Sequence, residues 1–336
     1  MPKPKVVIAF DKFRGSATAT ELSEAAVGAA DRLGWDSCAI PLADGGEGSL
    51  DVIGGPNKTT VVTSPLGDPV EAGWRLDGRT AYIEMAAASG LTVVGGADQN
   101  DAVAADTTGT GELISTAIEL GATTVVVFLG GSATTDGGWG AIRAMPPAPR
   151  MKGIELIVAC DVQTRFDEAA TVFGPQKGAS PAQVKFLTRR LQRLIQVYQE
   201  NYGIDVSEVP GAGAAGGLAG GLLALGARLE SGFSVLAERA ELDVALVGAD
   251  LVITGEGYLD HESFNGKVVG GVGAWSAAEG VPVVSIVGDR DPSVEAPEHL
   301  RVVSLVEAFG LDRAMHDTVE LVASIVADEL SRRHPT

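Results

Sequence analysis

The N-terminal region alternates short apolar runs with a helical pattern, and this alternation limits the possible folds more than any other feature. Residues 6–10 (VVIAF) contain no polar side chain, which favours a strand buried on both faces. Residues 18–33 then carry apolar side chains at helical spacing, namely Leu22, Ala25, Ala26, Ala29 and Leu33. A second strand is expected at 39–42, so the region predicts a βαβ unit with parallel strands.

The same alternation continues along the chain. Further helices are expected at residues 109–120, 181–202, 214–225, 266–278 and 314–332, and further strands at 123–129, 154–159, 251–254, 281–287 and 302–306. Residues 59–85 break at PLGDP and LDGR, which predicts a meander of short strands. The expected fold class is α/β with mostly parallel sheets flanked by helices, and 336 residues favour roughly two domains.

The formal net charge is −19 at pH 7, which argues against binding of nucleic acid or an anionic membrane because both require a basic field. We therefore expect a small anionic substrate, held by a local cluster of cations. No run has the ~18 apolar residues of a membrane span and none is typical of a signal peptide, which favours a cytoplasmic location. Four histidines leave little room for a His-rich metal site or a Ser-His-Asp triad.

Six expected strands end in polar loops, most of which combine glycine with a carboxylate. These loops begin at residues 11, 43, 130, 160, 254 and 288. The turn Asp44-Gly45-Gly46-Glu47-Gly48 holds more glycines and charges than a connection needs. In open α/β sheets ligands bind beyond the carboxyl ends of the strands, so the loops predict one site. Glycine N–H groups suit an anion, and carboxylates suit Mg²⁺ among phosphates.

The cations near these loops are few: Lys12, Arg14, Lys177 and Lys267. A lysine beside glycine at a helix entrance, as in Gly266-Lys267, is well placed to hold a phosphate.

Residues 211–216 (GAGAAG) formally match GxGxxG, the dinucleotide fingerprint. No good buried strand precedes them, and no acidic residue ends a second strand about 20 residues later. Tight packing of a small-residue helix and a phosphate-binding helix entrance are the alternatives.

Eight segments, in order, resemble the two-domain glycerate kinase family of the glycerate 2-kinase type. They are ADGGEG, IEMAAASGL, TTGTGELI, GGSATTDGG, VACDV, FGPQKGA, PGAGAAGGLAGGL and TGEGYLD. The resemblance implies phosphorylation of D-glycerate by ATP and Mg²⁺, usually at the 2-hydroxyl to give 2-phosphoglycerate. It also implies two α/β domains with the active cleft between them. We expect a discontinuous domain of residues 1–80 plus 290–336 and an inserted domain of residues 81–289. A homodimer is left open.

On this reading each candidate residue has an expected role. Catalysis is assigned to Asp44, Glu47 and Lys267; substrate binding to Asp11, Lys12, Arg14, Ser132, Thr134, Asp136 and Lys177; nucleotide binding to Gly130, Gly131, Gly211, Gly213 and Gly255; and metal binding to Asp161, Glu256 and Asp260. Which carboxylate acts as base and which binds metal stays open.

The chain also departs from the family pattern. Lys12 stands where relatives have serine, Thr135 where they have asparagine and Tyr258 where they have arginine. Residues 139–153 replace a longer segment of the relatives, and the prolines within residues 146–149 are expected to exclude a helix there. The shortening predicts a more open site and a broader or poorer kinase. Two other classes stay open: a nicotinamide-dependent oxidoreductase and a non-catalytic relative that binds a metabolite.

Overall fold

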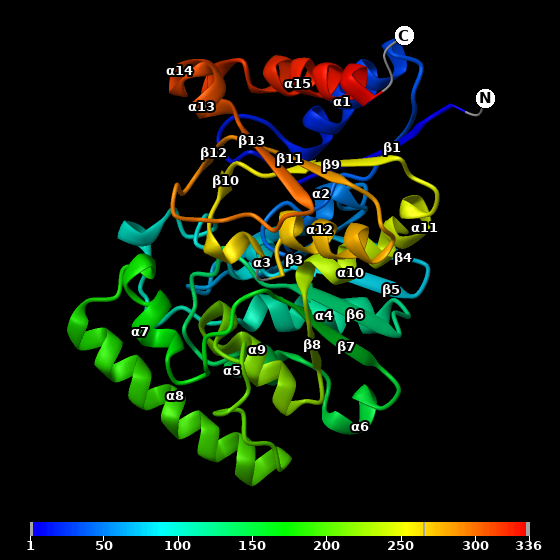
Figure 1. Cartoon of the computed structure of the whole chain (residues 1–336). Coiled ribbons are helices and arrows are strands. Elements are labelled where there is room, and N and C mark those ends of the chain that lie inside the picture. The colour runs from blue at the N-terminus through cyan, green and yellow to red at the C-terminus, as the bar shows by residue number, and fades with distance from the viewer. Residues whose placement is uncertain (1–2, 265, 334–336) are drawn as a thin grey trace. The chain divides into compact units, whose positions relative to one another are not determined.

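The computed structural model describes residues 3–264 and 266–333 (Figure 1). The chain divides into two compact units, the first made of Met1–Asp44 and Gly232–Thr336 and the second of Gly45–Ser231. These boundaries differ from the expected ones near residues 80 and 290. The reason is strand pairing: Thr80 begins a strand that pairs with residues 124–128, and Arg290 ends a short strand that pairs with residues 258–259, so neither position is a crossing between units.

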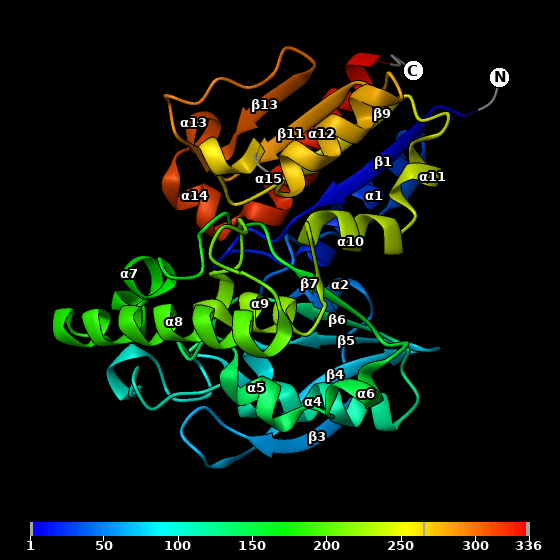
Figure 2. The same ribbon diagram turned by 90° about the horizontal axis from the view of Figure 1, so that it is seen from below.

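Unit 1 is built on a five-stranded parallel sheet. Its strands are β1 (Lys5–Phe10), β2 (Asp36–Ala39), β9 (Leu251–Gly255), β11 (Val283–Val287) and β13 (Leu300–Ser304), in the order β13-β11-β9-β1-β2. Strands β1, β9 and β11 are almost wholly buried, as their apolar sequences predict. Helices α1 (Ala19–Arg32) and α15 (Thr318–Arg333) cover one face, and α12 (Val268–Ala278) covers the other (Figures 1 and 2).

Helix α1 begins where the sequence signals it. The Thr18 side chain accepts from the backbone N–H of Glu21, and the Glu21 carboxylate accepts in return from the Thr18 N–H, which forms a capping box. Leu22, Ala26 and Ala29 then point into the core of unit 1. The helix thus returns the chain to the sheet, where β2 pairs with β1 in parallel.

Unit 2 contains a six-stranded mixed sheet. Its strands are β3 (Lys58–Thr63), β4 (Pro69–Asp77), β5 (Thr80–Glu84), β6 (Thr124–Phe128), β7 (Glu155–Ala159) and β8 (Arg228–Glu230), in chain order across the sheet. The expected meander is confirmed for β3, β4 and β5, which pair antiparallel, whereas β5 to β8 pair in parallel. Helices α4 (Thr108–Glu119) and α9 (Ala214–Ala224) pack on the sheet with α5 (Trp139–Ala144) beside them.

A second helical layer completes unit 2. The long helix α8 (Pro181–Tyr202) packs against α7 (Ala169–Phe173) and α9, and Leu187, Leu191 and Tyr198 bury in a separate core there (Figure 2). The remaining elements of the chain are short: α2 (Ser49–Val52), α3 (Ala86–Ser89), η1 (Ala97–Gln99), α6 (Ala148–Met151), η2 (Pro175–Lys177), α10 (Gly232–Arg239), α11 (Leu242–Leu246), β10 (Tyr258–Leu259), η3 (His261–Phe264), β12 (Asp289–Arg290), α13 (Leu305–Phe309) and α14 (Leu311–His316).

The expectation that prolines exclude a helix after α5 is wrong. Helix α6 spans Ala148–Met151 and has proline within its first turn. Proline is tolerated there because its missing N–H is one that the first turn leaves unpaired in any case.

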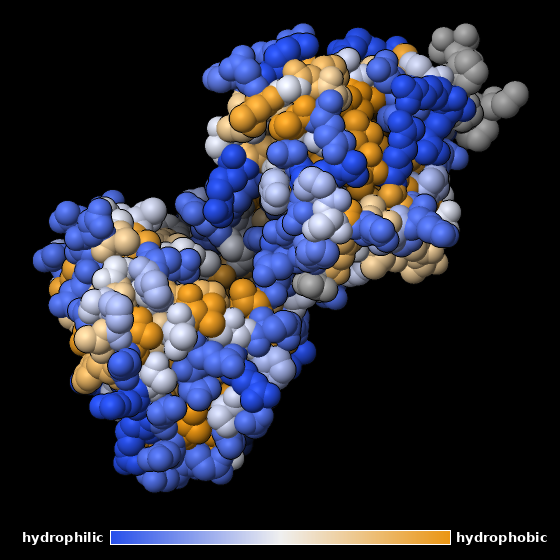
Figure 3. Space-filling model, turned by 60° about the vertical axis from the view of Figure 1, so that its left-hand side comes forward, coloured by the Kyte–Doolittle hydropathy of each residue, from blue (hydrophilic) through white to orange (hydrophobic). Residues whose placement is uncertain are grey.

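No helix in residues 3–264 and 266–333 is long and apolar enough to cross a membrane. Hydrophilic residues cover much of the face drawn in Figure 3.

Candidate active site

The strand order of unit 1 creates a topological switch point between β1 and β9. The chain passes from β1 to β2 on one side, and from β9 through β11 to β13 on the other. This is the doubly wound order in which ligands bind at the carboxyl edge, where the two directions diverge. Asp11 directly follows β1 and Glu256 directly follows β9, and the Asp11 N–H donates to the Gly255 carbonyl at 2.9 Å. The strand ends therefore bring two carboxyl groups together.

Asp11 lies in an environment that disfavours its charge. Burial and the neighbouring negative charge of Asp44 raise the pKa of Asp11 to about 7, against the lowering effects of Lys12 and Lys267. Asp44 lies in the turn that follows β2, the other neighbour of β1. The structure thus brings Asp11, Asp44 and the two lysines close enough to interact, as the strand-end argument predicts.

Glu256 is more deeply buried, with an exposed fraction of 7%. Burial raises the pKa of Glu256 to about 7, although a hydrogen bond from Ser263 lowers it. Its Oε1 atom is buried and has no hydrogen-bond partner among the described residues. A buried carboxylate oxygen without a donor is costly unless a cation or a protonated ligand group reaches it.

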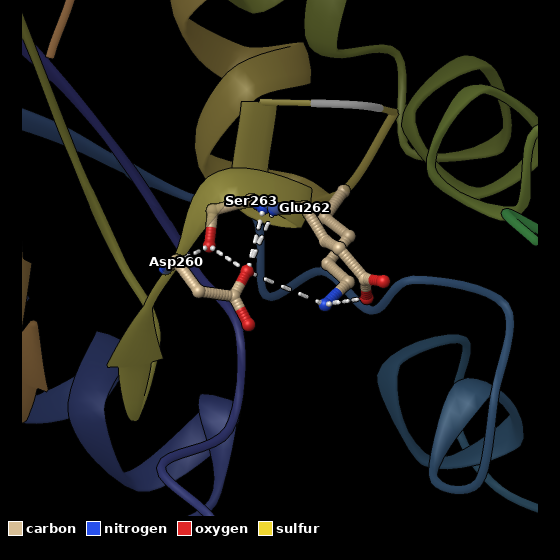
Figure 4. Close-up of polar contacts among 4 residues, drawn as sticks. Asp260, Glu262 and Ser263 are labelled. Atoms are coloured by element: carbon tan, nitrogen blue, oxygen red, sulfur yellow. Dashed lines mark hydrogen bonds and ion pairs between the residues drawn. The ribbon is translucent and has the colours of Figure 1, made fainter. Parts of the chain in front are cut away.

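Asp260 and Lys267 extend this cluster, since the charges of both act on Glu256. Figure 4 shows Asp260 beside Glu262 and Ser263. The Asp260 side chain accepts from the N–H groups of Glu262 and Ser263 at 2.9 and 3.1 Å, which fixes its orientation. The Lys267 Nζ lies 4.0 Å from Asp260 Oδ1 and 3.4 Å from Glu262 Oε2. Burial alone would lower the pKa of Lys267, but the charges of Asp260 and Glu262 outweigh it and raise that pKa. Lys267 occupies the N-cap position of α12 and keeps 27% of its side chain exposed.

The turn at residues 44–48 lies on the boundary between the units, because Asp44 ends the first segment of unit 1 and Gly45 begins unit 2. Gly45 and Gly48 have φ of 84° and 92°, which only glycine adopts readily. Within unit 2, a Cβ on Gly130 would lie 2.9 Å from the Gly46 Cα and 3.1 Å from the Glu47 nitrogen. Gly130 therefore lets the turn approach the loop after β6.

That loop is organised by Lys177, whose side chain is 2% exposed. The Lys177 Nζ donates to Ser132 Oγ at 2.7 Å and to the Thr134 carbonyl at 2.6 Å. Burial lowers the pKa of Lys177 to about 7, although Asp136 opposes the shift. Lys177 is thus enclosed by protein, and its expected contact with substrate is not supported by its position. Ser132 is half-buried, whereas Thr134 is fully buried.

Asp136 also holds the loop from within. Its Oδ2 accepts from the Thr107 N–H, the Thr107 hydroxyl and the Gly140 N–H at 2.8–3.0 Å, and its Oδ1 accepts from the Gly138 N–H at 3.1 Å. These four donors saturate a carboxylate that is 5% exposed. Its geometry is that of a structural acceptor, and its expected contact with the substrate stays a prediction.

Two residues that the sequence did not single out complete this arrangement. Asn100 donates to the carbonyls of Ala133 and Lys177 at 3.0 and 2.8 Å. Arg190 donates to the Thr135 carbonyl at 2.6 Å. No pattern marks Asn100, but Arg190 interrupts the apolar stripe of Leu187, Leu191 and Leu194 on α8, a signal that was available.

Packing alone accounts for three of the glycines expected to bind nucleotide, and their contact with a nucleotide stays a prediction. Added Cβ atoms would collide with the Arg165 carbonyl at Gly213 and with the Ile286 carbonyl at Gly255. At Gly211, where φ is 86°, the nearest atom is the Val162 carbonyl oxygen at 3.0 Å. The fingerprint at 211–216 therefore reads as tight packing. Gly131, by contrast, is exposed and has φ of 61°.

For the other expected site residues the structure gives their exposure and the unit to which each belongs. Arg14 and Glu47 are exposed, and Lys12 is half-buried. Asp161 belongs to unit 2, whereas Glu256 and Asp260 belong to unit 1. Among residues 3–264 and 266–333, no group of three or more His, Cys, Asp or Glu residues is arranged so that it could hold a metal ion.

Comparison with known proteins identifies relatives along almost the whole chain. The model of the glycerate kinase family matches residues 6–146 and 144–332. A glycerate 2-kinase of Escherichia coli (strain K12) is 38% identical, with 86% of each chain covered, and a glycerate kinase of Bacillus subtilis (strain 168) is 37% identical, with 84% of this chain and 85% of the relative covered. The crystal structure of a putative glycerate kinase 2 from Salmonella typhimurium LT2 matches with a TM-score of 0.83 at 32% identity, over 99% of this chain and 100% of that one.

These matches define the class of the protein as a kinase, an enzyme that transfers a phosphoryl group. The chain belongs to the glycerate kinase family.

Proposed function

We propose that this protein transfers the γ-phosphoryl group of ATP to a hydroxyl of D-glycerate, giving 2-phosphoglycerate, in the cytoplasm. The observation that carries the proposal is the acidic cluster at the switch point of unit 1. Asp11, Asp44 and Glu256 follow strands at one edge of a parallel sheet, and Lys267 lies beside them. Phosphoryl transfer requires charge neutralisation and positioning more than covalent chemistry, and this cluster supplies both signs of charge.

The donor set fits Mg²⁺. Mg²⁺ typically binds one or two carboxylates and fills its other positions with water and substrate phosphate, so a closed protein cage is not required. The buried, unpartnered Oε1 of Glu256 is suited to such a cation, and Asp260 is the second carboxylate nearby. When bound, the ion would neutralise charge on the phosphates of ATP. Lys267, at the entrance of α12, would contact a phosphate oxygen.

The Asp11–Asp44 pair would receive the proton of the substrate hydroxyl. In the reaction the hydroxyl oxygen forms a bond to the γ-phosphorus, the bond from that phosphorus to the β–γ bridging oxygen breaks, and ADP leaves. The hydroxyl proton passes to the carboxylate pair. Because burial and the charge of Asp44 raise the pKa of Asp11 to about 7, we assign this role to the pair.

Within unit 2, the loop after β6 holds backbone and hydroxyl donors of its own. Lys177 uses its amine to donate to Ser132 Oγ, so the Ser132 hydroxyl hydrogen is left to point elsewhere. We infer that Ser132 donates this hydrogen to an anionic oxygen of a ligand bound at the loop after β6, with the N–H groups near Gly131. Lys177 is then a positioning residue that acts through Ser132.

The test is release of ADP from ATP in the presence of Mg²⁺ and D-glycerate, with the position of the phosphate read by NMR. Accumulation of 2-phosphoglycerate supports the proposal. A panel of other hydroxy acids and sugar acids distinguishes an altered acceptor from loss of catalysis. Binding of D-glycerate without turnover of any acceptor would instead indicate a non-catalytic relative.

A further inference from the structure

Unit 2 contains a cavity of about 640 Å³ that the candidate active site does not use. It lies among the N-terminal part of α4, helix α5 and the middle of α8, and Asp136 of the loop after β6 forms part of its wall. Its volume lies within the range of small-molecule sites in proteins.

The cavity borders the segment in which this chain departs from its family. The two stretches of the family match meet at residues 144–146, where α5 ends, and Trp139, Arg143 and Ala144 of α5 line the cavity. After α5 only the short helix α6 precedes β7. Part of the wall, at Arg143 and Ala144, therefore lies at this break in the family match, whereas Thr108, Glu112 and Asp136 belong to segments that resemble the family.

Some polar side chains in the wall of the cavity already form hydrogen bonds within the protein, whereas others do not. Asp136 accepts four hydrogen bonds, and both carboxylate oxygens of Glu112 accept from Thr63 at 2.7 and 3.0 Å. Asp106 uses Oδ1 to accept from the Thr108 N–H at 2.9 Å, and no hydrogen bond to its Oδ2 occurs among the described residues. Across the same described part of the chain, the exposed Arg143 guanidinium makes no hydrogen bond or ion pair. Apart from the Arg190 Nε, which is buried without a hydrogen-bond partner among the described residues, a ligand meets one unused cation, Arg143, and one unused carboxylate oxygen, Asp106 Oδ2.

The net charge of the wall determines which charges a ligand must carry to bind there. Two arginines, Arg143 and Arg190, stand against three carboxylates, Asp106, Glu112 and Asp136, so the sum is 2 − 3 = −1. A simple anion would be attracted by Arg143 but repelled by the net negative charge of the wall. A simple cation would leave Arg143 without a partner. A ligand with both an ammonium and a carboxylate group satisfies both unused groups.

The rest of the wall is partly apolar. The half-buried Trp139 ring lies 6.4 Å from the Tyr198 ring, and Leu194 is 8% exposed. Such surfaces suit an apolar or aromatic side chain on the ligand.

We propose that this cavity is a second ligand site that binds an α-amino acid with an apolar side chain, with the carboxylate on Arg143 and the ammonium on Asp106. The site is joined to the loop after β6, because Arg190 in its wall donates to the Thr135 carbonyl. The neighbouring Thr134 carbonyl accepts from Lys177.

Isothermal titration calorimetry on the full chain tests this with L-phenylalanine and two analogues of the same shape. Phenethylamine lacks the carboxylate, and 3-phenylpropanoate lacks the ammonium. We expect saturable binding of L-phenylalanine, and affinity lower by roughly tenfold or more for each analogue, because each loses a charge-assisted hydrogen bond. Equal affinity for either analogue, or no saturable binding of L-phenylalanine, overturns the proposal.

Variants locate the binding in the cavity. Arg143→Ala and Asp106→Asn should each weaken L-phenylalanine binding by roughly tenfold or more. Arg189→Ala is the matched control, since Arg189 is an exposed residue of α8 that does not line the cavity, and it should bind normally. Asparagine at 106 can still accept from the Thr108 N–H, so the start of α4 is preserved. Normal affinity in both site variants would overturn the assignment.

Discussion

Replacing Lys177 with methionine should change how the stability of the protein depends on pH. Methionine keeps most of the volume and removes the amine, so the titration of one buried group is deleted. In the folded chain the pKa of Lys177 falls from 10.5 to about 7 because the side chain is buried. In the unfolded chain the Lys177 amine stays protonated up to its ordinary pKa of 10.5. Between pH 7 and pH 10.5 the unfolded state therefore binds more protons than the folded state.

The sign and size follow from proton linkage. Where the unfolded state binds more protons, the free energy of unfolding rises with pH. The stability that Lys177 adds through this rise is therefore complete above its unfolded pKa, and it is lost as the pH falls towards its folded pKa of about 7. From pH 7 to pH 9 the folded amine goes from about half protonated to almost neutral, while the unfolded amine stays almost fully protonated. At 1.36 kcal/mol per pH unit for one proton, wild type should gain about 2 kcal/mol over this interval.

Urea unfolding of wild type and Lys177→Met at pH 7 and pH 9 measures this difference. The other titrating groups are common to both proteins and cancel in the comparison. Lys185→Met is the matched control, because Lys185 is an exposed lysine of α8 and its removal should leave the pH dependence unchanged. A lysine Cε-labelled sample should also show one carbon that titrates near pH 7 and vanishes in Lys177→Met.

The reasoning fails if the free energies of wild type and Lys177→Met change in parallel between the two pH values. It also fails if every labelled lysine titrates above pH 9, since the amine would then be charged within the loop.

Three further predictions concern the candidate active site. Asp44→Asn should abolish turnover with an unchanged melting temperature, as read by ADP release and circular dichroism; unfolding of this variant would instead make Asp44 a structural cap. Lys267→Ala should lower kcat by ~10²–10³-fold, the usual cost of one lost charge-stabilising donor, and near-normal turnover in steady-state assays would contradict its contact with phosphate. Gly130→Ala should lower kcat on the order of 100-fold, because the added Cβ displaces the turn at Gly46; a crystal structure of the variant with the turn unmoved would refute this cause.

Much of the local structure could be predicted because the signals are local. Helix α8 begins and ends where expected: Ser180 and Gln183 form a capping box, Pro181 occupies the first turn, and Gly203 takes φ of 75° after the last turn. Strands β1, β9 and β11 of unit 1 were also recognisable, since their apolar runs are bounded by polar loops. Strand β2, by contrast, was expected at 39–42 and spans Asp36–Ala39.

The division into units could not be predicted in the same way. Residues 58–84 have the composition of hairpin strands, and nothing local indicates that β5 pairs in parallel with β6. That pairing assigns the meander to unit 2 and moves the boundary to residues 44 and 45. Such pairing depends on contacts between segments that are distant in sequence.

The candidate site likewise has features that local sequence predicts and features that depend on contacts between distant segments. The strand-end rule predicted that Asp11 and Glu256 would lie together, because strand ends are fixed by local pattern and sheet edge. It could not predict that Lys177 is enclosed or that Asp136 is saturated by internal donors. Burial of these two side chains arises where α8, η2 and the loop after β6 meet, which no single segment encodes.

The placement of unit 2 as one unbroken segment within unit 1 imposes an order on synthesis. Strand β1 leaves the ribosome early, yet its partner β9 comes late; the Thr254 hydroxyl that donates to the Ala9 carbonyl lies 245 positions away. At about 5–20 residues per second, β1 waits roughly 10–50 s for that partner. Unit 2 can complete its sheet in the interval, whereas the apolar β1 has only β2 beside it. The nascent chain therefore carries an unpaired, aggregation-prone strand edge until the last third of the protein is made.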